Sequence, residues 1–183
     1  FIINEYTNFV EINENRIINF SKPKDKNKRL IELLTNIYEN QENSIIYCCK
    51  PYLVEQYAEK IMDNMDIDVG LLEYTDLIEH IKRRFYSDWI VCQALEHRIG
   101  IHHGLVPKYI QKEIINLFNG GQIKFLLSTT TITEGVNTTA KNLIVIHNSK
   151  GSKPLKPFDA KNIAGRAGRF LEHYSGRVFA FEK

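Results

Sequence analysis

The sequence predicts an α/β domain with a mainly parallel sheet and helices on both faces. Short apolar runs alternate with longer segments whose apolar residues recur at helical spacing, and this alternation implies crossover connections between parallel strands. The runs are almost continuously apolar, as expected for strands that are buried on both faces. The 183 residues are enough for one domain with a sizeable core.

The first residues are predicted to form a separate leading segment, 1–20, ahead of a main domain, 21–183. Apolar stretches at 9–12 and 17–20 flank a polar turn, a pattern typical of a hairpin or of two short strands.

The main domain is predicted to begin with a helix and a strand-to-helix unit. A basic run at 21–29 precedes a helical apolar face at 30–37, and we interpret the run as a solvated linker and helix start; contact with a phosphate backbone is the alternative. The apolar run 44–49 predicts a buried strand. Pro51 then suits the first turn of a helix, where its missing N–H would be unpaired in any case.

The rest of the chain continues this alternation. Two helical segments are predicted within 71–99 and another after Pro107, which Gly120 and Gly121 should end. Further strands are expected at 100–102, 123–128, 143–147 and 177–181. The stretch 149–158, with its Gly, Ser, Lys and Pro residues, is predicted to be a loop.

Composition places few limits on function. The net charge of +2 at pH 7 permits an anionic partner without requiring one. No apolar run approaches the roughly 20 residues that cross a bilayer, and no signal-peptide layout opens the chain, so we expect a cytoplasmic protein with no membrane partner. Because the chain begins with phenylalanine, we expect it to be part of a longer polypeptide.

No metal site is predicted from the cysteines and histidines. Cys48 and Cys49 are adjacent in an apolar run, and with Cys92 they are interpreted as small buried hydrophobic residues without metal-ligand spacing. His102 and His103 are adjacent on an extended segment, so their side chains should point to opposite sides and cannot easily share a metal.

Two arginines near the end of the chain are the strongest functional signal. Arg166 and Arg169 lie three residues apart, and each follows a glycine. On a helix this spacing places both guanidinium groups on one face, where they can converge on one phosphate group. Gly165 and Gly168 favour close approach of backbone or ligand, because each costs a helix roughly 1 kcal/mol relative to alanine. The alternative is a solvated helix end whose arginines pair with nearby carboxylates.

Two further segments precede these arginines in a fixed order. They are Gly100-Ile-His-His-Gly-Leu-Val-Pro107 and Thr129-Thr-Thr-Ile-Thr-Glu-Gly-Val-Asn137. Together with Asn162-Ile-Ala-Gly-Arg-Ala-Gly-Arg169, they resemble motifs IVa, V and VI of the second RecA-like domain of superfamily 2 helicases, most closely the DExH branch of the Ski type. The resemblance covers roughly residues 44–183 and implies a RecA-like, P-loop NTPase-type domain of three layers.

The resemblance implies a nucleotide-binding role for five residues. Arg169, and Arg166 with it, match the arginines that reach the γ-phosphate of ATP across an interdomain cleft. Gly135 and Asn137 would lie near the ribose and phosphates. Asn162 stands where the family usually has glutamine, so it keeps the amide but has one methylene less reach toward water or nucleotide.

The resemblance also implies a nucleic-acid track at the carboxyl edge of the sheet. Thr129 would hydrogen-bond the nucleic-acid backbone, the alternative being a hydroxyl-rich turn without a ligand. His103 would lie near the bound strand, although a buried and hydrogen-bonded histidine is an equal alternative. Lys50, directly after a predicted strand, could contact a phosphate at the same edge.

Some parts of a complete motor are missing from this sequence. It contains neither a G-x-x-x-x-G-K-[ST] loop nor a DExH-type acidic strand end, which belong to the first RecA-like domain of the family. We therefore expect the C-terminal half of an ATP-dependent helicase or translocase that acts on single-stranded RNA or DNA and is inactive alone. An N-terminal RecA-like domain of the same polypeptide would hold most of the ATP and Mg²⁺.

Two other interpretations remain open at this point. One is a catalytically retired helicase-like scaffold, and the other is a Rossmann-type module that binds a phosphorylated metabolite, for which a G-x-G-x-x-G turn would be expected and is absent. The sequence specifies neither RNA against DNA nor the direction of movement, because contacts to a phosphate backbone carry no base information.

Overall fold

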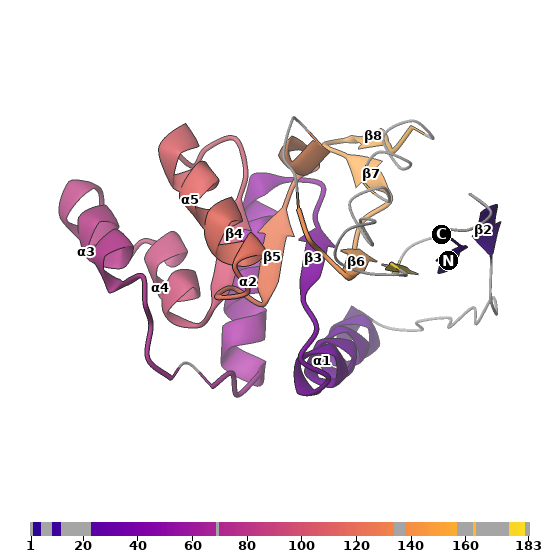
Figure 1. Ribbon diagram of the computed structural model, residues 1–183. Helices are drawn as coiled ribbons and strands as arrows, with labels where there is room; N and C mark the ends of the chain where they lie inside the picture. Colours follow the sequence, from indigo (N-terminus) through magenta and orange to yellow (C-terminus); the bar gives the residue numbers. More distant parts are fainter. Residues whose placement is uncertain are drawn as a thin grey trace.

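The computed structural model describes residues 2–4, 9–11, 23–68, 70–133, 138–156, 163 and 176–181. Within these ranges the chain forms an α/β domain around a seven-stranded sheet in the order β2-β1-β9-β6-β3-β5-β4 (Figure 1). Its strands are β1 (Ile2–Asn4), β2 (Phe9–Glu11), β3 (Ser44–Tyr47), β4 (Ile99–His102), β5 (Phe125–Ser128), β6 (Asn142–Val145) and β9 (Arg177–Ala180). The helices are α1 (Pro23–Glu39), α2 (Pro51–Asn64), α3 (Thr75–Arg84), α4 (Ile90–Glu96) and α5 (Lys108–Asn119).

Five neighbouring strands of the sheet, β9, β6, β3, β5 and β4, are parallel, which confirms the predicted fold class. At the centre, Ser44 of β3 pairs with Phe125 on one side and with Asn142 on the other. Every residue of β3, β4 and β5 is buried, as their continuous apolar runs predict. All five strands therefore end at one edge of the sheet, here called the carboxyl edge.

The edge of the sheet beyond β9 is antiparallel. β1 pairs with β2 and joins β9 through Ile2 and Arg177. The strand expected at 9–12 is present as β2, which pairs with the preceding β1. The strand expected at 17–20 lies outside the described residues. The division of the chain at residue 20 stays a prediction.

Helices cover both faces of the sheet. The connection from β3 to β4 through α2, α3 and α4 runs in one direction, and the connection from β4 to β5 through α5 runs back, so right-handed crossovers place α2 and α5 on opposite faces. Figure 1 shows α5 in front of the sheet and α2 behind it. No described helix is long and apolar enough to cross a membrane.

Residues 149–156 differ from the loop that we expected there. β7 (Ser149–Lys150) and β8 (Lys153–Pro154) form an antiparallel hairpin. Gly151 at its tip has a φ of 62°, a conformation that glycine adopts at no steric cost, so the residues that suggested a loop make a tight turn.

The basic run at 21–29 also has a structural role, because Lys26 Nζ donates a 2.8 Å hydrogen bond to the carbonyl of Ile146.

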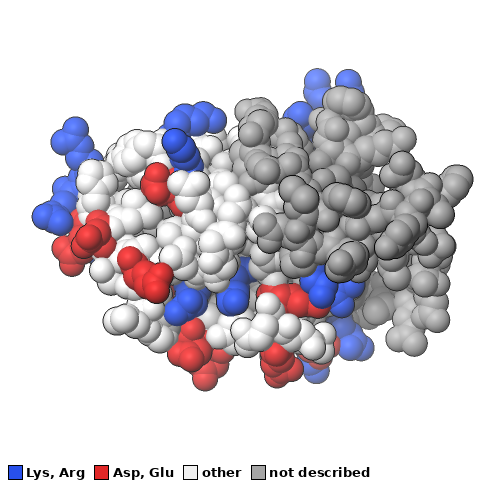
Figure 2. All heavy atoms as spheres, viewed as in Figure 1, with Lys and Arg blue, Asp and Glu red and all other residues white. Residues whose placement is uncertain are grey.

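Charged side chains are unevenly distributed over the described surface. In the view of Figure 1 the arrowhead of β5 points upward, so the carboxyl edge lies at the top. Figure 2 shows mostly Lys and Arg side chains along the upper margin of this face, over α3 and α5, whereas Asp and Glu side chains lie mixed with Lys and Arg below them. The carboxyl edge therefore carries the more positive margin of this face.

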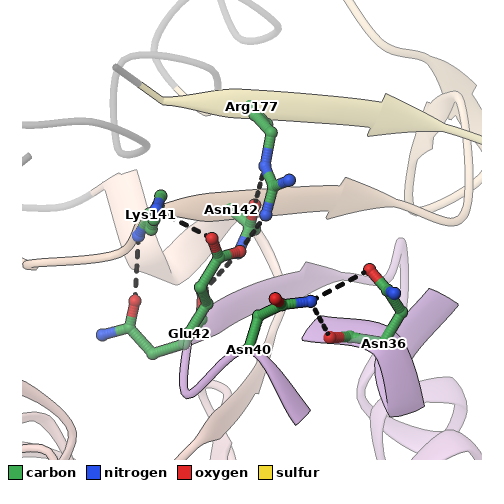
Figure 3. A network of polar contacts seen from close by, with 7 residues as sticks. Asn36, Asn40, Glu42, Lys141, Asn142 and Arg177 are labelled. Atoms are coloured by element: carbon green, nitrogen blue, oxygen red, sulfur yellow. Dashed lines mark hydrogen bonds and ion pairs between the residues drawn. The ribbon is translucent and has the colours of Figure 1, made fainter. Parts of the chain in front are cut away.

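The amino-terminal ends of three central strands are joined by ion pairs and hydrogen bonds (Figure 3). Glu42, just before β3, lies with Oε1 2.7 Å from Lys141 Nζ and accepts hydrogen bonds from Arg177 and, at 3.1 Å, from Asn142 Nδ2. Arg177 Nε in turn donates to Asn142 Oδ1 over 2.8 Å. Because the Glu42 side chain is only 14% exposed, its charge is stabilised by these partners more than by water.

Gly100 in β4 lies directly against a side chain of α5. A Cβ atom at this position would lie 2.7 Å from Ile114 Cγ2 and 3.0 Å from Leu126 Cδ1, distances that real Cβ contacts avoid. The absence of a side chain at Gly100 thus allows α5 to pack directly on β4.

We predict that Gly100→Ala lowers the free energy of unfolding by about 1–3 kcal/mol, because the added methyl group forces α5 away from β4. Urea unfolding followed by circular dichroism measures this change. Gly104→Ala is the matched control, since no atom lies within 4 Å of a Cβ built there. Equal stability of the two variants would contradict the proposed close packing.

Candidate functional site

The carboxyl edge brings together the segments that follow β3, β4 and β5. Lys50 lies just after β3 in extended conformation, and Pro51 begins α2, as expected. His102 ends β4 and His103 directly follows it, and Thr129 follows β5. The structure therefore places the described members of the predicted track at one edge of the sheet, although they come from three separate parts of the sequence.

His102 joins the end of β4 to the loop that follows β5. Its Nδ1 lies 3.1 Å from Thr131 Oγ1 and 3.3 Å from Ser128 Oγ, and Ser128 Oγ donates a 2.8 Å hydrogen bond to the His102 carbonyl. Thr131 Oγ1 is also 3.3 Å from Thr129 Oγ1. The buried imidazole thus supports the hydroxyl groups among which Thr129 lies.

The His102 ring is neutral at physiological pH. The residue is 3% exposed, and this burial lowers its pKa from 6.5 to about 4, with smaller contributions from the charge of Lys108 and from His103. A neutral ring can accept a hydrogen bond from a threonine or serine hydroxyl, whereas a protonated ring cannot. At neutral pH the ring therefore takes part in the hydroxyl cluster without carrying a charge.

His103 points away from His102, as predicted for adjacent residues on an extended segment. Its Nδ1 accepts a 3.3 Å hydrogen bond from the backbone N–H of Leu105, which leaves Nε2 as the protonated nitrogen of the neutral ring. Nε2 lies 3.3 Å from Glu55 Oε1 without good hydrogen-bond geometry. Burial lowers the pKa of His103, and the negative charge of Glu55 raises it by less. At 1% exposure, the ring offers no surface to a phosphate in this conformation.

The surroundings of His103 contain two polar residues that sequence reasoning missed. Gln111 of α5 is 4% exposed, and its Nε2 donates hydrogen bonds to the carbonyls of His103 (3.0 Å) and Val106 (2.5 Å). Glu55 reaches the same histidine from α2. No spacing in the sequence relates these residues to His103, because only the packing of α2 and α5 around β4 brings them together.

The structure does not describe the predicted nucleotide-binding residues. Gly135, Asn137, Asn162, Arg166 and Arg169 all lie outside the described residues, so their roles stay predictions.

One residue of the arginine-bearing segment is described. Ile163, directly after Asn162, is helical, 1% exposed and part of the hydrophobic core. Ile163 therefore packs against the core of the domain.

A comparison with known protein families identifies this arrangement. Residues 71–171 match the family described as the helicase conserved C-terminal domain. The chain belongs to this family. Its sequence relatives are superfamily 2 helicases of the DExH type, as the three motifs predicted, and the Rossmann-type alternative is therefore wrong.

Several curated proteins are similar to this helicase domain. Anti-bacteriophage protein B of Escherichia coli is 35% identical over 140 residues, which cover 76% of this chain and 19% of that protein. The antiviral helicase SKI2 of Saccharomyces cerevisiae is 41% identical over 81 residues, covering 41% of this chain and 6% of that one. The ATP-dependent DNA helicase Hel308 of Aeropyrum pernix is 31% identical over 90 residues, or 46% and 12% of the two chains.

A solved structure shares the fold of the helicase domain. The crystal structure of the DUF1998 helicase MrfA, bound to DNA and AMPPNP, superposes with a TM-score of 0.56 at 18% identity. The match covers 91% of this chain and 19% of MrfA. The helicase domain thus spans about a fifth of the length of both MrfA and the E. coli relative.

We predict that the helicase domain loses stability as the pH falls from about 6.5 to about 4. The folded-state pKa of His102 lies below its unfolded value, so the stabilisation is complete above the unfolded pKa and is lost as the unfolded chain takes up the proton. The loss from this residue is on the order of 2–3 kcal/mol. Urea unfolding at pH 7 and pH 4.5 compares the wild type with His102→Asn, which cannot titrate here. The same pH dependence in both proteins would refute this assignment.

Proposed function

We propose that this chain is the C-terminal lobe of an ATP-dependent helicase or translocase, and that single-stranded RNA or DNA lies along its carboxyl edge. The observation that carries the proposal is the contact of His102 with Thr131 and Ser128, which joins motif IVa to motif V at this edge. Two motifs that are distant in sequence thereby meet at one edge, and membership of the helicase family supports a nucleic-acid-binding role for that edge.

In this proposal the nucleic-acid backbone contacts Thr129 and Lys50. Lys50 is only half-buried at the start of α2, and its Nζ lies 6.0 Å from the centre of the Tyr52 ring, so its ammonium group is available for a phosphate. Thr129 is 8% exposed, and its hydroxyl is held by Thr131, which favours a defined direction for a hydrogen bond. His103 is buried beneath the surface of this edge, and its ring does not contact the nucleic acid.

ATP with Mg²⁺ is the proposed cofactor, and it supplies the phosphoryl group whose transfer to water drives the motor. Asn162, Arg166 and Arg169 offer an amide and two cationic guanidinium groups, a donor set that suits phosphate oxygens and not a metal ion. Arg169 would act as the arginine finger with Arg166 beside it, and Gly135 and Asn137 would approach the ribose and phosphates. Ile163, in the same segment, is part of the domain core.

An N-terminal RecA-like domain of the same polypeptide would hold most of the nucleotide in this proposal. The chain matches only about a fifth of its E. coli relative and contains no Walker loop, so the isolated chain would hydrolyse no ATP. MrfA, which has the same fold over this region, is a helicase seen with DNA and AMPPNP, and this supports the assignment of both partners.

We predict that Arg169→Ala in the full-length protein lowers ATP turnover by on the order of a thousandfold, because the guanidinium group stabilises charge that develops on the transferred phosphoryl group. Nucleotide affinity should change far less. Steady-state hydrolysis and nucleotide titration measure the two effects. Arg29→Ala on α1 is the matched control, since that arginine is exposed and pairs only weakly with Glu32. Near-normal turnover in Arg169→Ala would remove the finger assignment.

We predict that Thr129→Ala weakens single-strand binding and uncouples ATP hydrolysis from nucleic acid, whereas Thr129→Ser preserves both through its hydroxyl. Filter binding and hydrolysis with and without added RNA or DNA are the measurements. Thr75→Ala, at the exposed start of α3, serves as a control for loss of a threonine. Unchanged stimulation by nucleic acid in Thr129→Ala would refute the proposed contact.

A further inference from the structure

α3 and α5 meet at the surface through an aromatic contact. The rings of His80 and Tyr109 lie 5.9 Å apart at 81°, and His80 Nε2 is 3.3 Å from the Tyr109 hydroxyl. The two helices are far apart in sequence, but this contact fixes the second half of α3 beside the first turn of α5. The proposed function uses neither helix surface.

Exposed cations surround this contact on both helices. Arg83 and Arg84 follow His80 by three and four residues, and Lys112 follows Lys108 by four, so on each helix these side chains share a face. We refer to the α3–α5 patch as the six exposed residues His80, Arg83, Arg84, Lys108, Tyr109 and Lys112.

The cations of the α3–α5 patch are available for a ligand. Arg83 lies 3.8 Å from Glu79, but the two side chains are 77% and 66% exposed, so this pair is weak and easily exchanged. Within the described part of the chain, Arg84, Lys108 and Lys112 form no ion pair.

Acidic side chains also lie on the faces that carry the patch. Asp76 precedes His80 by four residues, and Glu113 follows Tyr109 by four, so each neighbours the central contact. Figure 2 shows basic side chains over α3 and α5 at the upper margin of this face, with an acidic side chain between them and a mixture of acidic and basic side chains below.

The patch is continuous with the proposed nucleic-acid track. Lys108 begins α5 only a few residues after His102 and His103, and its charge acts on the His102 ring. Leu105, between the two histidines and Lys108 in the sequence, is 76% exposed, so the surface that joins the histidine segment to the patch is accessible to solvent.

We propose that the α3–α5 patch binds the phosphate backbone of the same single strand, beyond the part held at Thr129, and that Tyr109 presents its ring to a base. This inference rests on the proposed function. The four cations are spread over two helices around an aromatic ring that is 47% exposed, an arrangement that suits a flexible polyanion with stacking bases. An acidic protein segment would use the cations but would have no need of the ring.

The test uses the full-length protein and a series of single-stranded oligonucleotides of increasing length, each titrated at several salt concentrations. We expect Arg83→Ala/Arg84→Ala to bind the shortest oligonucleotides like the wild type and the longer ones more weakly. With long oligonucleotides, the slope of log affinity against log salt should fall by about 1 for each phosphate that the variant no longer neutralises. Lys28→Ala/Arg29→Ala removes two exposed cations from α1 and should change neither quantity.

A second pair of variants tests the aromatic ring. Tyr109→Ala should weaken binding of the longer oligonucleotides, and Tyr109→Phe should restore it, because stacking needs the ring and not the hydroxyl. Wild-type affinity and salt dependence in the double arginine variant would overturn this inference while leaving the proposed function intact. A full-length protein that binds no single strand at all would overturn both. Loss of affinity in Arg83→Ala/Arg84→Ala with none in Tyr109→Ala would overturn the stacking role of Tyr109 and support the phosphate contacts of the patch.

Discussion

Parallel pairing of β3 on both of its sides is the constraint on which the rest of the structure depends. Because β5 and β6 run in the same direction as β3, every connection between these strands must cross a face of the sheet, and all loops that follow them emerge at one edge. The ion pairs and hydrogen bonds of Glu42 hold the opposite edge, where β3, β6 and β9 begin. The strand ends are thus fixed at the amino side and leave the carboxyl side free for ligands.

The carboxyl edge relies on buried polar groups that are neutral. His102 and His103 are both buried, and in both cases burial disfavours the charged ring. Such groups cost free energy unless they find hydrogen-bond partners, and here the partners are Thr131 and Ser128 for one ring and the Leu105 backbone for the other. The two histidines therefore stiffen the edge from within, while Lys50 and the α3–α5 patch provide the positive charge outside it.

The sequence predicted the elements of this fold well, because each buried strand is a short apolar run and each helix has an apolar face. It was less informative where geometry depends on contacts between distant segments. Gly151 suggested a loop and in fact forms the tip of a hairpin, since glycine suits both. Glu55 and Gln111 carried no signal at all, because their relation to His103 exists only after α2 and α5 have packed around β4. The arginines of motif VI were the clearest signal in the sequence, and because they lie outside the described residues, their proposed roles rest on that resemblance.

Cys48, at the end of the central strand, is completely buried, and burial raises the pKa of its thiol far above the ordinary value. A thiol in this state is inert toward alkylating reagents until the strand separates from its neighbours. Cys49 next to it is only partly buried. The two adjacent thiols therefore differ in accessibility. Alkylation of Cys48 reports that β3 has separated from its neighbours, whereas alkylation of Cys49 does not.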